Sequence, residues 1–268
     1  MKKIIAYTVA ILWLLFTVVP FYFLVVNSLK AQSEFLVNPL GLPSKVKLDN
    51  YVNAWRDIKI YMVNSLIVVI PSVLLTLLIS SMAAFGFSRF KFKWKESLLA
   101  LFLGGMSIPF HTTLIPIYII TRNIGLYDSL LALIGPYVTS NLPISIFILT
   151  SFMEEIPHEL EEAAMMDGCK PWGIFTKIIL PLSRSGIITV GIYDAIMCWN
   201  ELVYALVLLS SPQNKTLPMG LWDFQGRWAV NIPMTATAVV ISIIPILVFY
   251  ILFRGRIIEG MIAGALKE

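Results

Sequence analysis

Six predominantly apolar runs, each long enough to cross a lipid bilayer, limit how this chain can fold. They lie at residues 4–29, 62–88, 98–121, 130–152, 186–209 and 234–253. A helix needs about 20 apolar residues to span the hydrocarbon core of a membrane. The runs therefore predict an all-α, polytopic membrane protein with six transmembrane helices, arranged as a single transmembrane domain over residues 1–268.

The composition excludes a soluble globular protein. Hydrophobic residues make up 58% of the 268 residues and charged residues only 13%, and the mean hydropathy is +0.82. That leaves too little polar surface to cover a soluble fold. The net charge of +4 is ordinary for a membrane protein and gives no reason to expect a nucleic-acid partner.

Two features indicate that each apolar run is a retained, continuous span. The first run has 26 residues, longer than the hydrophobic part of a signal peptide, so we expect an uncleaved first span. Prolines occur inside the runs, where neighbouring helices can satisfy the freed carbonyls, so we expect kinks rather than helix ends. These prolines are at positions 20, 71, 109, 116, 136, 143 and 245.

The distribution of Lys and Arg predicts that both termini are cytoplasmic. With this orientation, 12 of the 20 basic residues fall on the cytoplasmic side, including the cluster at 89–95 in a short loop. Short loops are where the positive-inside rule is most reliable. Residues 30–61 and 210–233 then form outer loops, and residues 153–185, here called the coupling loop, face the cytoplasm.

The coupling loop contains the sequence EEAAMMDGCKPWGIFTKIILP, from Glu161 to Pro181. Acidic residues favour the positive N-terminal end of a helix and glycine favours its C-terminal cap. We therefore expect a helix over 157–167 with Gly168 as its cap, then a second helix that starts at Pro171 and ends at Pro181. An amphipathic helix pair that only connects two spans is the alternative interpretation.

The spacing of Glu162-Ala163-Ala164, Gly168, Ile178 and Leu180-Pro181 resembles the EAA signature of permease subunits of bacterial ABC importers. Further segments resemble the carbohydrate-uptake branch, and the most similar type is the second, six-span permease of maltose-type importers. Cys169 and Ser183-Arg184-Ser185 depart from the usual pattern. The further segments are Asn50-Tyr51-Val52-Asn53-Ala54-Trp55, Asn64-Ser65-Leu66, Arg89-Phe90-Lys91-Phe92, Ile108-Pro109, Leu114-Ile115-Pro116-Ile117-Tyr118, Trp199-Asn200-Glu201, Thr216-Leu217-Pro218, Arg254-Gly255 and Ala263-Gly264-Ala265.

The resemblance implies a multi-pass permease of the bacterial cytoplasmic (inner) membrane that imports a sugar or oligosaccharide. Its implied partners are a second permease, two ATP-binding subunits, an extracytoplasmic sugar-binding protein and the lipid bilayer. No Gly-Lys dipeptide occurs, so the chain has no phosphate-binding P-loop. We therefore expect a non-catalytic subunit without a cofactor of its own, with ATP and Mg bound by the partners. The implied ATPase-coupling residues are Glu161, Glu162, Ala163, Ala164, Asp167, Gly168, Ile178, Leu180 and Pro181.

Two acidic residues lie within the fifth run. Asp194 and Glu201 are seven residues apart, which places them on one helix face about 10 Å apart. Buried charges in membranes usually line a cavity or pair with other groups. With Tyr193, Trp199 and Asn200 they are candidates for the translocation pathway, although they could equally hold helices together. In maltose-type importers the other permease carries most of the sugar site. An ion-coupled secondary transporter using both carboxylates is the alternative function.

Aromatic residues mark the second outer loop. In the family this loop reaches into the secreted binding protein, which makes Gln213, Asn214, Trp222 and Phe224 candidate contact residues. Packing of the aromatic side chains at the membrane interface is the competing interpretation.

Cysteine and histidine give no sign of a metal or disulfide. Cys169 lies in the coupling loop and Cys198 in the fifth run, and His111 and His158 have no ligand spacing. We expect no metal site and no catalytic residue.

Overall fold

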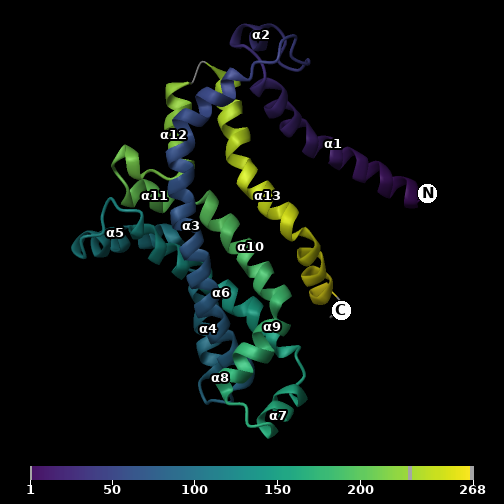
Figure 1. Cartoon of the computed structure of the whole chain (residues 1–268), viewed down its shortest axis with the longest axis vertical. Helices are drawn as coiled ribbons and strands as arrows, with labels where there is room; N and C mark the ends of the chain where they lie inside the picture. The colour runs from purple at the N-terminus through teal and green to yellow at the C-terminus, as the bar shows by residue number, and fades with distance from the viewer. Residues whose placement is uncertain (1, 229–230, 266–268) are drawn as a thin grey trace. The chain divides into compact units, whose positions relative to one another are not determined.

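The computed structural model describes residues 2–228 and 231–265, which form helices, turns and loops without a β-strand (Figure 1). The all-α prediction is confirmed. Residues 1, 229–230 and 266–268 lie outside the described residues, and so do the two chain ends predicted to be cytoplasmic. The chain divides into two compact units, one of Met1–Val63 with Thr216–Pro245 and one of Asn64–Lys215 with Ile246–Glu268.

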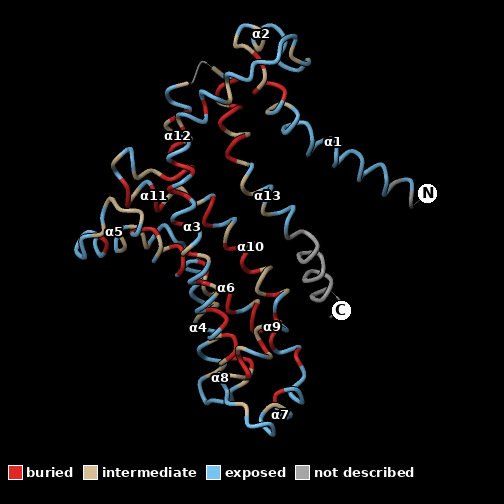
Figure 2. The backbone as a smooth tube through the Cα atoms, viewed as in Figure 1, coloured by how far each residue is buried: buried red, intermediate tan, exposed pale blue. Residues whose placement is uncertain are grey.

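The first unit holds α1 (Lys2–Ser28), α2 (Gln32–Val37), the start of α3 (Asp49–Arg89), α12 (Leu217–Arg227) and the start of α13 (Ile232–Ala265). Backbone carbonyls at the end of α1 are bound by polar side chains of this unit. Asn50 donates to the carbonyls of Ser28 and Lys30 at 2.9 Å, and Thr237 donates to that of Ser28 at 3.1 Å. Most residues of α1 are exposed (Figure 2), as expected of a helix that faces lipid or another subunit.

The second unit is built around α6 (Leu131–Glu154), which packs most extensively against α10 (Arg184–Asn200). Pro136 and Pro143 lie inside α6 without ending it. The remaining elements are the rest of α3, α4 (Lys95–Gly105), the 3₁₀ helix η1 (Phe110–Thr113), α5 (Leu114–Asn123), α7 (Glu159–Met166), α8 (Pro171–Ile174), the π-helix η2 (Phe175–Ile179), α9 (Leu180–Leu182), α11 (Val203–Leu208), the 3₁₀ helix η3 (Pro212–Asn214) and the end of α13.

By length and apolarity, four helices of the described chain can cross a membrane. Up to six spans result if each of two bent helix pairs, Lys95–Gly105 with Phe110–Asn123 and Pro171–Leu182 with Arg184–Asn200, is one span. Continuous helices fill the first, second, fourth and sixth predicted runs. The count of six and the single domain over 1–268 therefore stay predictions.

The third run is not one helix, contrary to the expectation of a kink at Pro109. α4 ends at Gly105, and the segment that resumes at Phe110 is turned by 89°. Gly104 and Gly105 are poor helix formers, and Pro109 lacks the N–H that would continue the ladder. Pro109 has ψ of 121°, an extended backbone value, and directly precedes η1, so the chain between Gly105 and Phe110 is not helical.

The fifth run is also interrupted. α10 stops at Asn200, Glu201 is extended with ψ of 126°, and the short helix α11 follows. Glu201 therefore lies between two helices, and the spacing argument for an unbroken face through Asp194 and Glu201 does not hold.

Helix α3 is longer than its apolar run. It begins at Asp49 and has 41 residues, about 61 Å at 1.5 Å per residue, roughly twice the thickness of the hydrocarbon core. Residues 49–61, predicted to be outer loop, are instead the first turns of this helix.

Candidate functional sites

The coupling loop contains the two helical segments that the sequence predicts, joined by a sharp turn. Helix α7 is Glu159–Met166, with three glutamates in its first turn. Gly168 has φ of 80°. Its N–H donates to the Met165 carbonyl and that of Cys169 donates to the Ala164 carbonyl, both at 2.9 Å. This pair of bonds is a Schellman motif, so the predicted glycine cap is confirmed.

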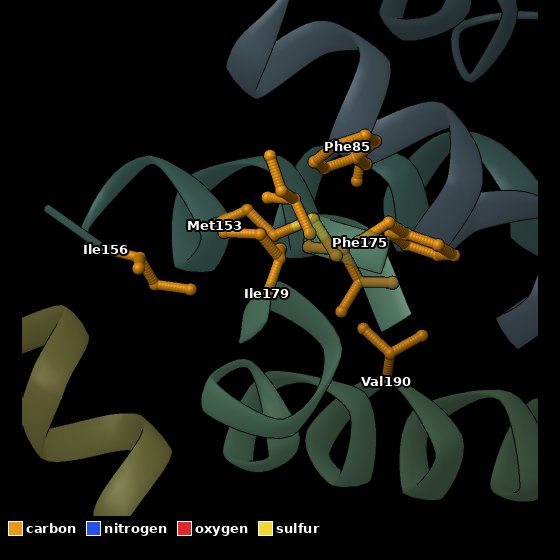
Figure 3. Close-up of a cluster of buried hydrophobic side chains, with 9 residues drawn as sticks. Phe85, Met153, Ile156, Phe175, Ile179 and Val190 are labelled. Carbon is orange, nitrogen blue, oxygen red and sulfur yellow. The ribbon is translucent and has the colours of Figure 1, made fainter. Parts of the chain in front are cut away.

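The second segment belongs to the hydrophobic core. Ile174, Phe175 and Ile179 are almost fully buried among apolar side chains of α3, α6 and α10 (Figure 3). The rings of Phe85 and Phe175 lie 5.1 Å apart. The partners from the three helices are Ala84, Phe85, Leu149, Met153 and Val190, with Ile156 from the linker after α6.

A π-helical turn, η2, precedes Pro181. Proline has no N–H to donate, and a π-turn is a common local rearrangement of a helix. The segment then ends at Leu182, one residue after Pro181. Ile178 and Leu180 are partly buried against the core, whereas Pro181 is exposed.

Most of α7 faces away from the core. Glu162 and Ala163 are exposed, Ala164 is half-buried against the core, and the side chains of Leu160 and Met166 are exposed. Asp167 and Gly168 are exposed at the end of the helix. The helix therefore presents a small, partly apolar surface, which suits close approach by another protein.

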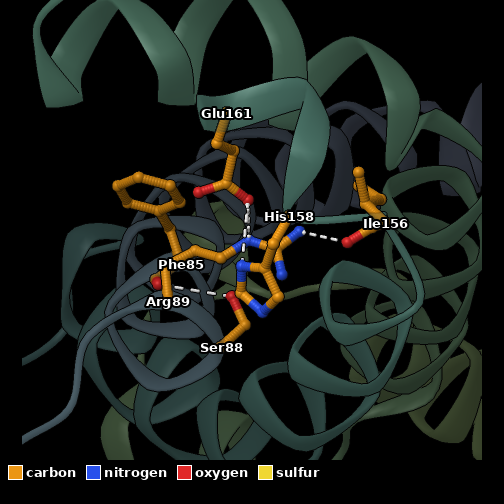
Figure 4. Close-up of polar contacts among 6 residues, drawn as sticks. All are labelled: Phe85, Ser88, Arg89, Ile156, His158 and Glu161. Atoms are coloured by element: carbon orange, nitrogen blue, oxygen red, sulfur yellow. Dashed lines mark hydrogen bonds and ion pairs between the residues drawn. The ribbon is translucent and has the colours of Figure 1, made fainter. Parts of the chain in front are cut away.

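Glu161 is the exception, because its side chain is 11% exposed and forms an ion pair with Arg89. Arg89 Nε lies 2.5 Å from Glu161 Oε1 (Figure 4), and the arginine side chain is only 2% exposed. Arg89 also donates from Nη2 to the carbonyl of Ile156 at 2.9 Å. His158 Nδ1 lies 3.9 Å from the same glutamate oxygen. In the sequence Arg89 is a loop charge and part of the segment Arg89-Phe90-Lys91-Phe92, and no local pattern links it to a partner 72 positions later.

Hydroxyl groups of α6 bind both acidic residues of the fifth run. Ser145 donates to Asp194 Oδ1 at 3.0 Å, and Asp194 is completely buried. Tyr137 donates to Glu201 Oε2 at 2.9 Å, and the N–H of Tyr204 donates to Oε1 at 2.8 Å. Glu201 therefore caps the start of α11 and joins it to α6. The spacing of Tyr137, Asn141 and Ser145 along one face of α6 is a sequence signal for these partners.

A cavity of about 600 Å³ lies in the second unit, beside both helix breaks. Phe110, Tyr137, Tyr193, Glu201 and Tyr204 contribute to its wall. Of the predicted pathway residues, Tyr193 and Glu201 line the cavity. Asp194, Trp199 and Asn200 do not line it: Trp199 is buried, and Asn200 is exposed with its amide bonded to the Ile196 carbonyl at 2.8 Å.

The loop before α6 is tied to the second outer loop. Asp128 accepts hydrogen bonds at 2.9 Å from the backbone N–H groups of Ser210 and Ser211, and one from the Ser211 hydroxyl. The Ser211 hydroxyl, followed by the two N–H groups, lowers the pKa of Asp128 to about 2. Asn214 donates to the Asp128 carbonyl. Gln213 is exposed, and its carbonyl accepts a bond of 2.7 Å from Asn64.

The two aromatic candidates of the outer loop have opposite environments in α12. Trp222 is 65% exposed, whereas Phe224 is 0% exposed. The interpretation of Phe224 as a contact residue does not fit this burial, because its ring lies inside the fold, with its centroid 6.1 Å from that of the tilted Trp228 ring. Trp222 keeps an accessible surface for a partner.

The cysteines and histidines lie in separate parts of the fold. Both cysteines are free thiols, and Asn141 donates to Cys198 Sγ at 3.3 Å. Within the described residues no three His, Cys, Asp or Glu side chains are grouped to hold a metal ion.

Comparisons with known proteins identify the family. A family model described as "Binding-protein-dependent transport system inner membrane component" matches residues 38–256. The chain is 51% identical to a putative ABC transporter permease protein, ORF2, of Caldicellulosiruptor sp. (strain Rt8B.4), over 95% of this chain and 94% of that protein. It is 36% identical to the sulfoquinovosyl glycerol transport system permease protein SmoH of Agrobacterium fabrum, over 96% and 87%.

A solved structure shares the fold. It is described as a bacterial ABC transporter involved in the import of the acidic polysaccharide alginate, and it matches with a TM-score of 0.82 at 20% identity, over 95% of both chains. The resemblance to importer permeases is confirmed by these comparisons. This chain belongs to the family of inner membrane components of binding-protein-dependent transport systems, whose members are non-catalytic permease subunits.

Proposed function

We propose that this chain is the transmembrane permease subunit of an ATP-driven importer for a sugar or oligosaccharide. It forms the translocation pathway with a second permease and works with two ATP-binding subunits and an extracytoplasmic sugar-binding protein. Support comes from family membership and from relatives whose names include sulfoquinovosyl glycerol, diacetylchitobiose and trehalose transport. The second permease and the sugar-binding protein are separate subunits in this proposal, and the ATP-binding subunits hold the sites for ATP and Mg.

The proposal that α7 couples ATP hydrolysis by the partner subunits to transport rests on the exposed face of this helix. Glu162 and Ala163 are exposed on a helix that ends in a rigid glycine turn, and α8 to α9 are packed into the core. An ATPase subunit that binds α7 can therefore move the core, because α7 is joined through the glycine turn to the buried segment α8 to α9. In this scheme Glu162 makes a polar contact with the ATPase subunit and Ala163 allows its close approach, whereas Ile178 and Leu180 hold the second helical segment against the core.

The cavity is the proposed part of the pathway within this chain. Tyrosine rings stack on sugar rings, and hydroxyl and carboxylate groups bind sugar hydroxyls. Tyr193 and Glu201 remain candidates for this role, and Tyr137 and Tyr204 join them. Asp194 lies outside the cavity wall and is bonded to Ser145, so we assign it to holding α10 against α6.

The ion-coupled alternative needs two accessible carboxylates that bind and release an ion. Asp194 is completely buried and Glu201 already accepts bonds from Tyr137 and Tyr204. This arrangement does not provide the two accessible carboxylates that ion coupling needs, and so it favours the ATP-driven function.

The deciding experiment uses the complete complex with its binding protein in proteoliposomes. We expect ATPase activity stimulated by a subset of a carbohydrate panel, and uptake of the same sugars that depends on ATP. Uptake driven by an ion gradient without ATP would contradict the proposal.

A further inference from the structure

Two neighbouring glutamates of α7 have opposite environments, although the sequence predicts a coupling role for both. The Glu161 side chain is 11% exposed and paired with Arg89 inside the fold. Glu162 is exposed. Because consecutive residues point about 100° apart on a helix, the same helix can face the core with one carboxylate and a partner with the next.

Arg89 connects three segments of the second unit. It is the last residue of α3, its Nε pairs with Glu161 on α7, and its Nη2 donates to the Ile156 carbonyl in the linker after α6. Figure 4 shows the guanidinium between the glutamate and the Ile156 carbonyl. The only buried residue of α7, all of which is described, is Glu161, so this pair is the principal polar attachment of the helix.

The burial of the pair makes it sensitive to loss of either partner. A charged group that loses its partner inside a protein pays a desolvation cost that no remaining contact offsets. Arg89 Nε and Nη1 and Glu161 Oε1 are buried without a hydrogen bond of normal geometry within the part of the chain that the structure describes, so the opposite charges of the ion pair are what compensate their burial. Without Glu161 the guanidinium would keep only the Ile156 carbonyl, and α7 would lose its fixed orientation.

We propose that Arg89 is a positioning residue of the coupling mechanism and that the two glutamates have separate roles. Glu161 binds Arg89 and fixes the orientation of α7, whereas Glu162 faces the ATPase subunit. The inference rests on the proposed function, since it assigns parts to the same ATP-driven coupling.

The ion pair also gives a route for movement. A displacement of α7 acts on Arg89 at the end of α3 and, through Ile156, on the end of α6. α6 carries Tyr137 and Ser140 of the cavity wall. Movement at the cytoplasmic face therefore reaches the cavity along α6, and the Gly168 turn is not the only connection between α7 and the core.

The first test measures the orientation of α7 without requiring transport. Spin labels are placed at Met166→Cys on α7 and Ser97→Cys on α4, in a background with Cys169→Ser and Cys198→Ala, and the distance distribution is recorded by pulsed electron resonance. We expect Glu161→Gln and Arg89→Met to broaden this distance distribution, because a segment that loses its attachment opens locally more often. Glu162→Gln should leave the distribution unchanged.

A second ion pair supplies the matched control. Lys95 and Glu154 lie 3.6 Å apart with 35% and 50% of their side chains exposed. Exposed pairs contribute little to stability, so Glu154→Gln should leave the distribution as it is in the parent. An unchanged width in Glu161→Gln would overturn the proposal.

The second test uses the assembled complex. Glu161→Gln should retain the ATPase subunits through purification but import about tenfold less sugar per ATP, within the ~5–150-fold range usual for coupling between sites. Glu162→Lys should instead lose ATPase subunits. Equal loss of these subunits in Glu161→Gln would mean that Glu161 contacts the ATPase directly, and the proposal would be wrong.

Two further variants separate positioning from folding. Arg89→Met with Glu161→Met removes both charges and restores a stable apolar core, yet it should keep the broad distance distribution. Arg89→Lys keeps the charge and should recover part of the parent's coupling. If the double variant regains the narrow distribution, the pair only balances charge and the proposal fails. A parent complex that imports no sugar would contradict the proposed function, and the spin-label test would still decide the role of Arg89.

Discussion

The N–H of Cys169 donates to the carbonyl of Ala164 at 2.9 Å and so closes the end of α7 around Gly168. This bond requires the left-handed backbone of Gly168, whose φ is 80°. A Cβ at this glycine would meet no atom within 4 Å. The need for glycine therefore comes from the backbone conformation and not from crowding.

Replacing Gly168 by valine should change the orientation of α7 relative to the core of its unit. A β-branched residue at positive φ costs about 1–3 kcal/mol, and relief of this strain changes the turn into Pro171. We expect normal insertion and normal pairing with the second permease, but weak retention of the ATPase subunits on purification. Gly135→Ala is the control, because Gly135 lies inside α6 with open space around it. Full retention in Gly168→Val would mean that the turn is a simple connector.

Removing the Ser145 hydroxyl should destabilise the pairing of α6 and α10. Asp194 is completely buried, and Ser145 donates to it at 3.0 Å. A buried acceptor left without its donor costs about 1–3 kcal/mol, so Ser145→Ala should lower the thermal unfolding temperature in detergent. Ser151→Ala, which loses only a 3.2 Å bond to the Phe147 carbonyl, should change it little. Similar shifts for both variants would argue against this role.

Acid should loosen the outer loop through Asp128. Its pKa is lowered from 3.8 to about 2 by the Ser211 hydroxyl and the N–H groups of Ser210 and Ser211. A carboxyl with a lowered pKa stabilises the fold above its unfolded value and loses that contribution as pH falls through the folded value. The free energy of unfolding, measured between pH 4 and 2, should thus depend less on pH in Asp128→Asn, because asparagine has no carboxyl group to titrate. Asparagine also tolerates the positive φ of 59° at this position, so the backbone should be kept. An identical pH profile would exclude the mechanism.

The predicted topology can be checked with thiol labels. In a background with Cys169→Ser, a membrane-impermeant reagent should reach a cysteine at Gln213 in intact cells. A cysteine at Glu155 should react only after permeabilisation, because the positive-inside rule places the coupling loop in the cytoplasm. Both positions are exposed, so lack of access cannot account for a negative result. The reverse pattern would overturn the orientation.

Trp222 should take part in binding-protein contact. Its side chain is 65% exposed, and exposed tryptophans are frequent anchors of protein interfaces. Trp222→Ala should reduce the stimulation of ATPase activity by the binding protein without affecting assembly. Trp94→Ala, another exposed tryptophan at 64%, serves as control. Undiminished stimulation would assign Trp222 to interface packing.

Local features of this protein were predictable from the sequence. Hydropathy located a helix in every apolar run, because a long apolar run has few alternatives in a membrane. The glycine turn was predictable because Gly168 acts through its own backbone conformation. The break between Gly105 and Phe110 was not predictable, because a proline in a membrane span can either kink a helix or interrupt it, and tertiary contacts decide.

Long-range contacts account for what the sequence analysis missed. Arg89 binds Glu161 from another helix, and Phe224 is fully buried in the fold. Nothing in the neighbouring sequence distinguishes Phe224 from the exposed Trp222. The hydroxyl partners of Asp194 and Glu201 do have a signal in the sequence, because the polar residues Tyr137, Asn141 and Ser145 repeat every four residues on α6.

The unequal burial of the coupling loop defines what can be exchanged between permeases. Residues 158–168 face outward apart from Glu161 and Ala164, whereas Ile174, Phe175 and Ile179 fill a space shaped by α3, α6 and α10. A graft that transfers α7 with its glycine turn, and keeps an acidic residue opposite Arg89, should redirect the chain to a different ATPase subunit. A graft that extends through α9 would bring foreign core side chains, so chimeric transporters are best joined between Cys169 and Pro171.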